Sequence, residues 1–359
     1  MGVESRRVGA VRGKKNPPPY FSHEFVITNH GDIMSCILMV IVLGFMFQVT
    51  LPFSQLLVVP QYNTTFQQTN DSAPQVLYRS GVRDLGALFF YTIVWITVHC
   101  IVQEFIIDKI QRRLHMSRSR LTRFSESSQL APFAIYSLGH ALYILHELGV
   151  QKDFSLLWSG YPEAHRYVPL NYKLFFIFQI SYWLHQFPEF YFQKLKRDEI
   201  RERTVYSVLF LGFITIAYFA NFTRLALVLL AIEYLSLAIL HGSRIFYFSS
   251  RNPNAGRSFR IWNLAFIIVR LSSMVISVLV LWYGLRSLET PYINLQSGNF
   301  NTHMIRLNAL FFLLAVQLYL IYQFARFHFS RWTSRSTSQD TQPKKKNYSK
   351  GKKDSKKSN

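Results

Sequence analysis

Long apolar runs limit what this chain can fold into more than any other feature of its sequence. A helix needs about 20 mostly apolar residues to cross the ~30 Å hydrocarbon core of a bilayer, because each residue rises ~1.5 Å. The sequence predicts an all-α polytopic membrane protein with about eight spans. They are expected near residues 33–53, 85–107, 130–150, 169–192, 204–221, 225–248, 261–285 and 304–327.

The composition is both strongly basic and rich in hydrophobic residues, so charged and apolar residues are expected in different parts of the chain. Lys and Arg total 40 against 19 Asp and Glu, a net charge of +21, yet 50% of the residues are hydrophobic and 16% are aromatic. A soluble nucleic-acid-binding protein of this charge would carry more charged and fewer aromatic residues. The two cysteines, Cys36 and Cys100, lie in apolar runs and fit neither a disulfide framework nor a metal-knuckle spacing.

Basic residues collect in alternate loops of the eight-span arrangement. Most of the 40 fall at 1–31, 108–127, 193–203, 243–260 and from Arg326 onward. Lys and Arg accumulate in the cytoplasmic loops of membrane proteins. We therefore expect both termini in the cytosol.

The loop after the first span carries two glycan acceptor sequences. Asn63-Thr64-Thr65 and Asn70-Asp71-Ser72 both match Asn-x-Ser/Thr in a polar stretch. We expect glycosylation at Asn63, Asn70 or both, which would place this loop in the lumen of the endoplasmic reticulum.

The tail from Thr333 to Asn359 is lysine-rich and of low complexity, so we expect it to be disordered. Its charge suits anionic lipid head groups, and contact with ribosomal RNA at a membrane-bound ribosome is the alternative. Lys356 and Lys357 near its end resemble a dilysine retrieval signal of resident endoplasmic reticulum membrane proteins.

Ionisable residues inside apolar spans need a partner or a wet cavity, because a charge at the bilayer centre costs roughly 2.5 to 3.5 kcal/mol on insertion scales. His185 and Glu189 are four residues apart on one helix face. We interpret them as a hydrogen-bonded pair at the membrane interface. Metal binding or proton exchange is the alternative, although two ligands are too few for a closed metal site.

Charges of opposite sign lie near the middle of two successive predicted spans. Glu233 lies at mid-span with His241 roughly along the same helix face, and Arg270 lies in the middle of the next span. We expect Glu233 and Arg270 to form an ion pair between neighbouring helices. The alternative is that these groups line a polar cavity open to lipid or to a passing peptide.

No catalytic or cofactor motif is present in the sequence. It has no Gly-rich phosphate loop, no His-Glu-x-x-His, no Gly-x-Ser-x-Gly and no adjacent histidine pair. We therefore expect neither enzymatic activity nor a cofactor or metal site.

Several segments resemble the translocating chain-associated membrane proteins, a group within the wider family that shares a TLC-type membrane domain. They include SHEFVITNHGDIMSC at 22–36, QEFIIDKIQRRLHMSRSR at 103–120, QISYWLHQFPEFYFQKLKRDEI at 179–200 and EYLSLAILHGSRIFYFS at 233–249. The resemblance runs from about Ser22 to Trp332 and leaves the two ends of the chain uncovered.

The resemblance implies a multi-pass protein of the endoplasmic reticulum membrane beside the Sec61 channel. Its partners would be signal sequences and transmembrane segments of nascent chains, whose translocation or insertion it would assist, together with membrane lipids. We expect a groove between helices, apolar apart from groups such as Glu233 and Arg270, as the place of contact. The domains implied are a cytosolic segment at 1–31, two spans with a luminal loop at 32–116, a TLC-type domain at 117–326 and a basic cytosolic tail at 327–359.

The same wider family includes the ceramide synthases, so a lipid-binding or lipid-regulating role, or an acyltransferase activity, is the rival interpretation. Those enzymes look similar around KLKRDEI at 194–200 but carry an adjacent histidine pair a few residues further on. Here Arg201 to Ser207 contain no histidine, which leaves a proton-abstracting base unassigned.

Overall fold

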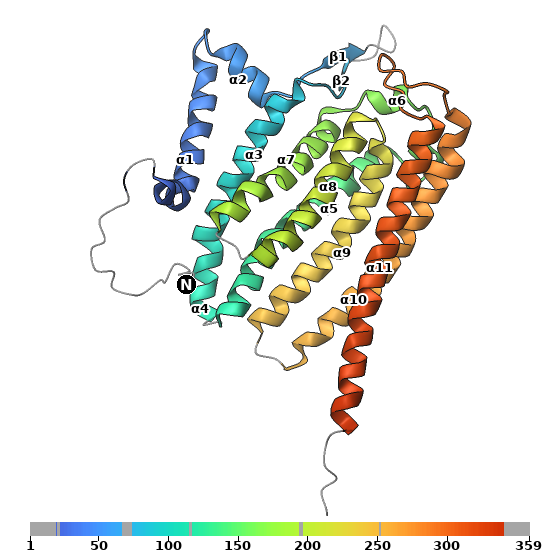
Figure 1. Ribbon diagram of the computed structural model, residues 1–359. Coiled ribbons are helices and arrows are strands. Elements are labelled where there is room, and N and C mark those ends of the chain that lie inside the picture. The colour runs from blue at the N-terminus through green and yellow to red at the C-terminus, as the bar shows by residue number, and fades with distance from the viewer. Residues whose placement is uncertain are drawn as a thin grey trace, which may run out of the picture.

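Long helices make up most of the computed structural model, which describes residues 19, 22–66, 74–114, 117–193, 197–250 and 253–340. The α-helices are α1 (His23–Leu43), α2 (Leu51–Val58), α3 (Asp84–Ile101), α4 (Asp108–Leu114), α5 (Arg118–Glu147), α6 (Glu163–Arg166), α7 (Leu170–Phe192), α8 (Arg197–Phe219), α9 (Thr223–Ser249), α10 (Ser258–Ser277) and α11 (His303–Asp340). They form one bundle with α1 at one edge and α10 and α11 at the other (Figure 1). The predicted all-α polytopic membrane fold is confirmed.

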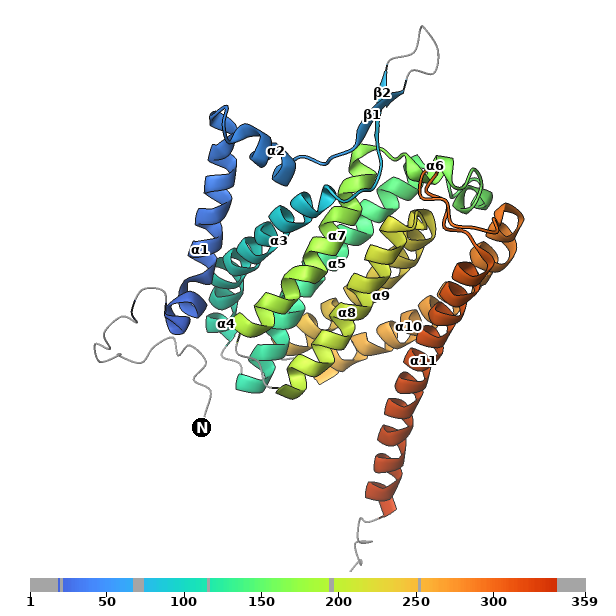
Figure 2. The same ribbon diagram turned by 45° about the horizontal axis from the view of Figure 1, so that its top comes forward.

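Shorter elements connect or extend these helices. Two strands, β1 (Asn63–Phe66) and β2 (Gln75–Tyr78), pair antiparallel with Asn63 opposite Tyr78. Two π-helical segments, η2 (Val102–Ile107) and η5 (Val278–Gly284), continue α3 and α10, and the 3₁₀ turns are η1 (Gly44–Met46), η3 (Phe154–Leu157), η4 (Pro253–Arg257) and η6 (Leu285–Leu288). The strands and α6 lie at one end of the bundle, here called the hairpin end (Figure 2).

Eight of the helices in the described residues have 18 residues or more, and six helical stretches are also apolar enough to cross a membrane. These are His23–Met46, Asp84–Leu114, Glu199–Phe219, Thr223–Ser249, Ala255–Leu288 and His303–Thr333. The predicted spans near 130–150 and 169–192 lie in α5 and α7, which are long but less apolar. Because α7 buries Lys173, Gln179 and Glu189 against other helices rather than lipid, apolarity is not required at these positions, and the count of eight is approximate.

The first span differs from the predicted 33–53. α1 begins at His23, where the Ser22 side chain accepts a hydrogen bond from the Phe25 N–H at 3.2 Å. The apolar stretch ends at Met46, and after a turn the separate helix α2 returns toward α3. The apolar sequence continues through this turn, so hydropathy alone merges two helices into one span.

The connection from α2 to α3 contains a hairpin that the all-α prediction does not include. β2 continues the pairing through a bridge between Tyr78 and Val168 just before α7. Asn63 is exposed at the first position of β1. Asn70 lies outside the described residues.

The core of the bundle is aromatic and lies where α3, α5, α7, α8 and α9 meet, and α5 packs extensively against α9. A chain of buried hydrogen bonds crosses it. The Trp183 indole donates to the Tyr234 hydroxyl at 3.0 Å, that hydroxyl donates to Gln179 Oε1 at 2.5 Å, and Gln179 donates to Ser137 Oγ at 2.8 Å. These polar groups are therefore satisfied within the protein, as an apolar surrounding requires.

α11 is longer than the predicted span at 304–327 and continues to Asp340. In both views it projects beyond the other helices at the end opposite the hairpin (Figures 1 and 2). α11 thus extends into the stretch from Thr333 that we expect to be disordered, because extending an existing helix is far easier than nucleating one. Residues 341–359, with Lys356 and Lys357, lie outside the described residues, and their lipid or RNA contacts stay predictions.

Candidate functional site

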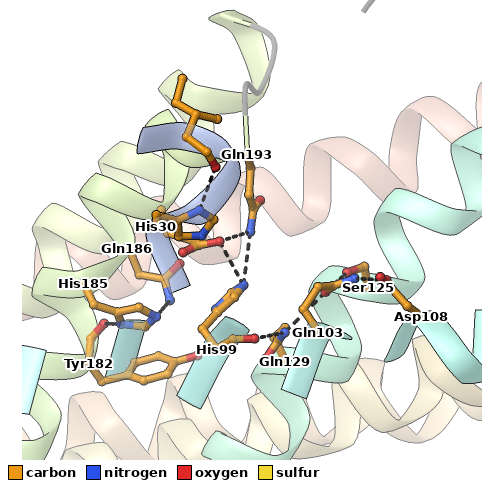
Figure 3. Close-up of polar contacts among 12 residues, drawn as sticks. His30, His99, Gln103, Asp108, Ser125, Gln129, Tyr182, His185, Gln186 and Gln193 are labelled. Carbon is orange, nitrogen blue, oxygen red and sulfur yellow. Dashed lines mark hydrogen bonds and ion pairs between the residues drawn. The ribbon is translucent and has the colours of Figure 1, made fainter. Parts of the chain in front are cut away.

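Ionisable side chains gather where α1, α3 and α7 meet (Figure 3). The last turns of α3 and α7 lie toward the end of the bundle opposite the hairpin (Figure 1). His99 Nε2 lies 3.2 Å from Glu189 Oε1, and the Gln193 amide donates to the same oxygen at 2.9 Å. The His30 ring of α1 stacks on Phe192 with centroids 4.3 Å apart. We call His30, His99, His185, Glu189 and Gln193 the His99–Glu189 cluster.

The π-helical segment η2 directly follows the turn of α3 that carries His99. A π-helix opens the regular hydrogen-bond ladder and is frequent at functional sites. The carbonyl of His99 accepts a hydrogen bond from the Gln129 amide at 3.2 Å, and Ser125 donates to Gln103 Oε1 at 2.7 Å. Side chains of α5 thereby hold α3 in place below the cluster (Figure 3).

The partners of His185 and Glu189 differ from the predicted hydrogen-bonded pair. Glu189 contacts His99 and Gln193, whereas the His185 ring bonds to the Tyr182 carbonyl and lies 3.4 Å from the Gln186 amide. The His99 and His185 rings are 5.7 Å apart. His99 is thus the partner that sequence reasoning missed, although a lone histidine within a span already indicates the need for one.

Two features limit the chemistry of the cluster. Glu189 Oε2 is buried without a hydrogen-bond partner, so one side of the carboxylate is unsatisfied. No group of three or more His, Cys, Asp or Glu side chains among the described residues could hold a metal ion. The geometry offers a buried carboxylate next to imidazole rings.

A second polar cluster lies at mid-depth, between α9, α10 and α11. Arg270 donates a hydrogen bond from Nη2 to Glu233 Oε2 and another from Nη1 to Gln317 Oε1, the latter at 2.9 Å. Its guanidinium also lies over the Phe266 ring, 5.1 Å from the centroid. The Arg270 side chain is 2% exposed and that of Glu233 is 20% exposed. The structure therefore brings together two of the charges singled out from the sequence.

His241 does not join this pair. Its Nδ1 lies 3.2 Å from Ser127 Oγ of α5, and the side chain is buried. This contact ties α9 to α5, on a different side of α9 from Arg270.

A third cluster, at the hairpin end, was not anticipated from the sequence. Lys173 Nζ lies 2.7 Å from Asp84 Oδ1 with both side chains fully buried. The same ammonium donates to the carbonyls of Gln61 and Arg79 at 2.7 and 2.8 Å, and the Tyr218 hydroxyl donates to Asp84 Oδ2 at 2.8 Å. Opposite charges at the ends of two predicted spans are the signal that would have found it.

Comparison with known proteins covers nearly all of this architecture. The profile of the TLC domain family matches residues 123–326. Translocating chain-associated membrane protein 2 of Mus musculus is 36% identical over 323 residues, covering 90% of this chain and 86% of the relative, and its Homo sapiens counterpart is 37% identical with the same coverage. The chain belongs to the translocating chain-associated membrane protein family.

Two of the polar clusters differ in their position relative to the TLC domain. The matched residues contain Glu233, Arg270 and Gln317, so the mid-depth cluster lies wholly within the domain. The His99–Glu189 cluster joins the domain to α1 and α3, which precede it. The chain is thus a multi-pass membrane protein in which the first two long helices are fastened to the TLC domain by polar contacts.

Proposed function

We propose that this chain is a translocon-associated protein of the endoplasmic reticulum membrane. It contacts signal sequences and transmembrane segments of nascent chains beside the Sec61 channel and assists their translocation and membrane insertion. The observation that carries the proposal is the likeness over 90% of the chain to relatives whose names describe association with translocating chains.

The exposure of α1 supports this role. Only 6% of the apolar window of His23–Met46 is buried inside the protein. Met39, Val40 and Val42 are 56%, 69% and 54% exposed. In a bilayer such a face meets lipid or the apolar helix of another polypeptide, which is the kind of contact that the proposed role requires.

The distribution of charge supports a cytosolic location of both termini. The basic helix α4, with Arg112, and the basic first turns of α8, with Arg201, lie at the end opposite the hairpin, and α11 leaves the bundle at that same end (Figure 1). By the positive-inside rule this end faces the cytosol. The hairpin with Asn63 then faces the lumen.

We also propose that the chain acts without catalysis. The rival acyltransferase role would draw on a histidine–carboxylate contact such as that between His99 and Glu189. Purified protein incubated with acyl-CoA and a long-chain amine should release no more CoA than buffer. Turnover that disappears in His99→Gln would replace this proposal with an enzymatic one.

Reconstitution tests the translocon role directly. Vesicles containing the Sec61 channel and signal-recognition components would be prepared with and without this protein, and the protected fraction of several secretory substrates would be measured. We expect the protein to raise the yield for a subset of signal sequences. Equal yields for every substrate would contradict the role.

A further inference from the structure

We infer that the Glu233–Arg270 pair is a contact site, within the membrane, for a hydrogen-bond-donating side chain on the transmembrane segment of another polypeptide. The inference rests on the proposed function and specifies which transmembrane segments the protein would prefer to contact. A segment with an amide or ammonium group at mid-depth would be held at this site, and a purely apolar segment would not.

The exposed fraction of the carboxylate side chain distinguishes this pair from the clusters around Asp84 and Glu189. The Asp84 side chain is fully buried against Lys173, and that of Glu189 is 5% exposed beside His99. Glu233 is 20% exposed although its partner Arg270 is 2% exposed. Among the three, Glu233 alone offers its carboxylate to the surface, and it lies near the middle of α9.

One oxygen of this carboxylate is free to accept a further hydrogen bond. Arg270 donates to Oε2, and within the described residues no bond reaches Oε1. Oε1 is also absent from the buried polar atoms that lack a partner, so it is accessible at the surface. The pair therefore holds Glu233 in place through one oxygen and presents the other.

The surroundings favour a donor. Nothing in the hydrocarbon core can donate to a carboxylate, so a side-chain amide or ammonium at the same depth satisfies Oε1 and is itself satisfied. Hydrogen bonds between transmembrane helices are modest, and a preference of about three- to tenfold is expected.

Crosslinking of paired nascent chains tests the inference. Two stalled chains would carry the same leucine-rich transmembrane segment and photoreactive residue, one with Leu and one with Gln at the centre. We expect the Gln segment to crosslink to this protein about three- to tenfold more than the Leu segment. Moving the Gln two helical turns toward either end should abolish the difference, a control that needs no change in the protein.

A matched variant removes the site while leaving no unpaired charge. Glu233→Met together with Arg270→Met replaces the ion pair by side chains of similar volume, a change that buried ion pairs often tolerate. The ratio of Gln to Leu crosslinks should fall to about one, with the Leu crosslink unchanged. Equal crosslinking of both segments to the original protein, or a ratio that persists in the double variant, would overturn the inference alone. Absence of all crosslinks would overturn the proposed function and this inference with it.

Discussion

Lys173 forms polar contacts with parts of the chain that are far apart in sequence. Its ammonium pairs with Asp84 of α3 and donates to two loop carbonyls, while Asp84 also accepts from Tyr218 of α8. Replacing one partner of such a pair strongly destabilises the fold, because the remaining charge stays buried without a partner.

Lys173→Met should therefore lower the free energy of unfolding by about 3 to 5 kcal/mol, since it leaves Asp84 unpaired. Thermal unfolding in mild detergent would measure the loss. Lys152→Met is the matched control, because Lys152 is exposed in the loop after α5. Equal melting temperatures for the two variants would show that the pair does not stabilise the fold.

His165 makes the hairpin end sensitive to acid. Burial, together with the charge of Arg224, lowers the pKa of His165 from its usual value near 6.5 to about 3. Below pH 6.5 the unfolded chain binds a proton that the folded chain does not, so the stabilisation is complete above pH 6.5 and is lost as the pH falls toward 3.

The difference in unfolding free energy between the original protein and His165→Gln should consequently shrink by about 2 kcal/mol from pH 7 to pH 5. The glutamine can still donate to the Ser159 carbonyl, which lies 3.2 Å from His165 Nε2, but it does not titrate. Parallel melting curves at pH 7, 6 and 5 would check this. A difference independent of pH would mean that His165 binds its proton over the same pH range in the folded and the unfolded chain.

Among single residues, opposite charges in the middle of apolar spans are the ones that sequence reasoning finds. Glu233 and Arg270 stand out because each must be satisfied inside the membrane. His99 and Lys173 were not assigned partners, because their contacts depend on how α3 and α7 pack and not on spacing within one helix. Glu189 was recognised, but its partner comes from another helix and not from His185 four residues away.

At the scale of elements, the close approach of α2 to α3 depends on a missing side chain. A Cβ atom at Gly86 would lie 2.6 Å from the carbonyl oxygen of Leu56, which is too close for backbone atoms to tolerate. The Ser54 hydroxyl donates to the Ile41 carbonyl at 2.8 Å, so α2 links α1 to the bundle at the hairpin end.

Gly86→Ala should displace α2 and lower the melting temperature, because backbone must move to relieve the contact. Gly139→Ala is the control, since a Cβ there meets nothing within 4 Å in α5 and alanine stabilises a helix by roughly 0.5 to 1 kcal/mol relative to glycine. Comparison of the two melting temperatures in detergent would check both signs. A neutral Gly86→Ala would mean that α2 does not pack against α3 as described.

Apolar runs predicted the long helices well, since a helix that crosses a bilayer needs about 20 mostly apolar residues in sequence. They predicted the ends of the first span poorly, because the apolar sequence continues from α1 through a turn into α2. The β1–β2 hairpin and the π-helical segments were not predicted. Their short patterns are weak in sequence, and they are decided by packing of β2 against α7, of η2 against α5 and of η5 against α11.

At the scale of the whole molecule, the proposed orientation in the membrane rests on the distribution of charge and is testable through glycans. We expect glycosidase digestion to increase the gel mobility of protein inserted into microsomes, because it removes the glycan. Replacing both Asn63 and Asn70 should have the same effect on mobility, and digestion should then change nothing further. Single replacements would show which site is used, and Asn63 is exposed at the start of β1. A shift that persists in the double replacement would place a different loop in the lumen.

In its proposed role this membrane protein contacts translocating chains. The most direct test of this contact is a signal-sequence-bearing chain stalled in endoplasmic reticulum membranes, with a photoreactive residue in the apolar part of the signal, followed by recovery of this protein after illumination. We expect a crosslink that disappears when the chain is released by puromycin and that is absent for a chain without a signal sequence. No crosslink with any signal sequence or transmembrane segment would contradict the account.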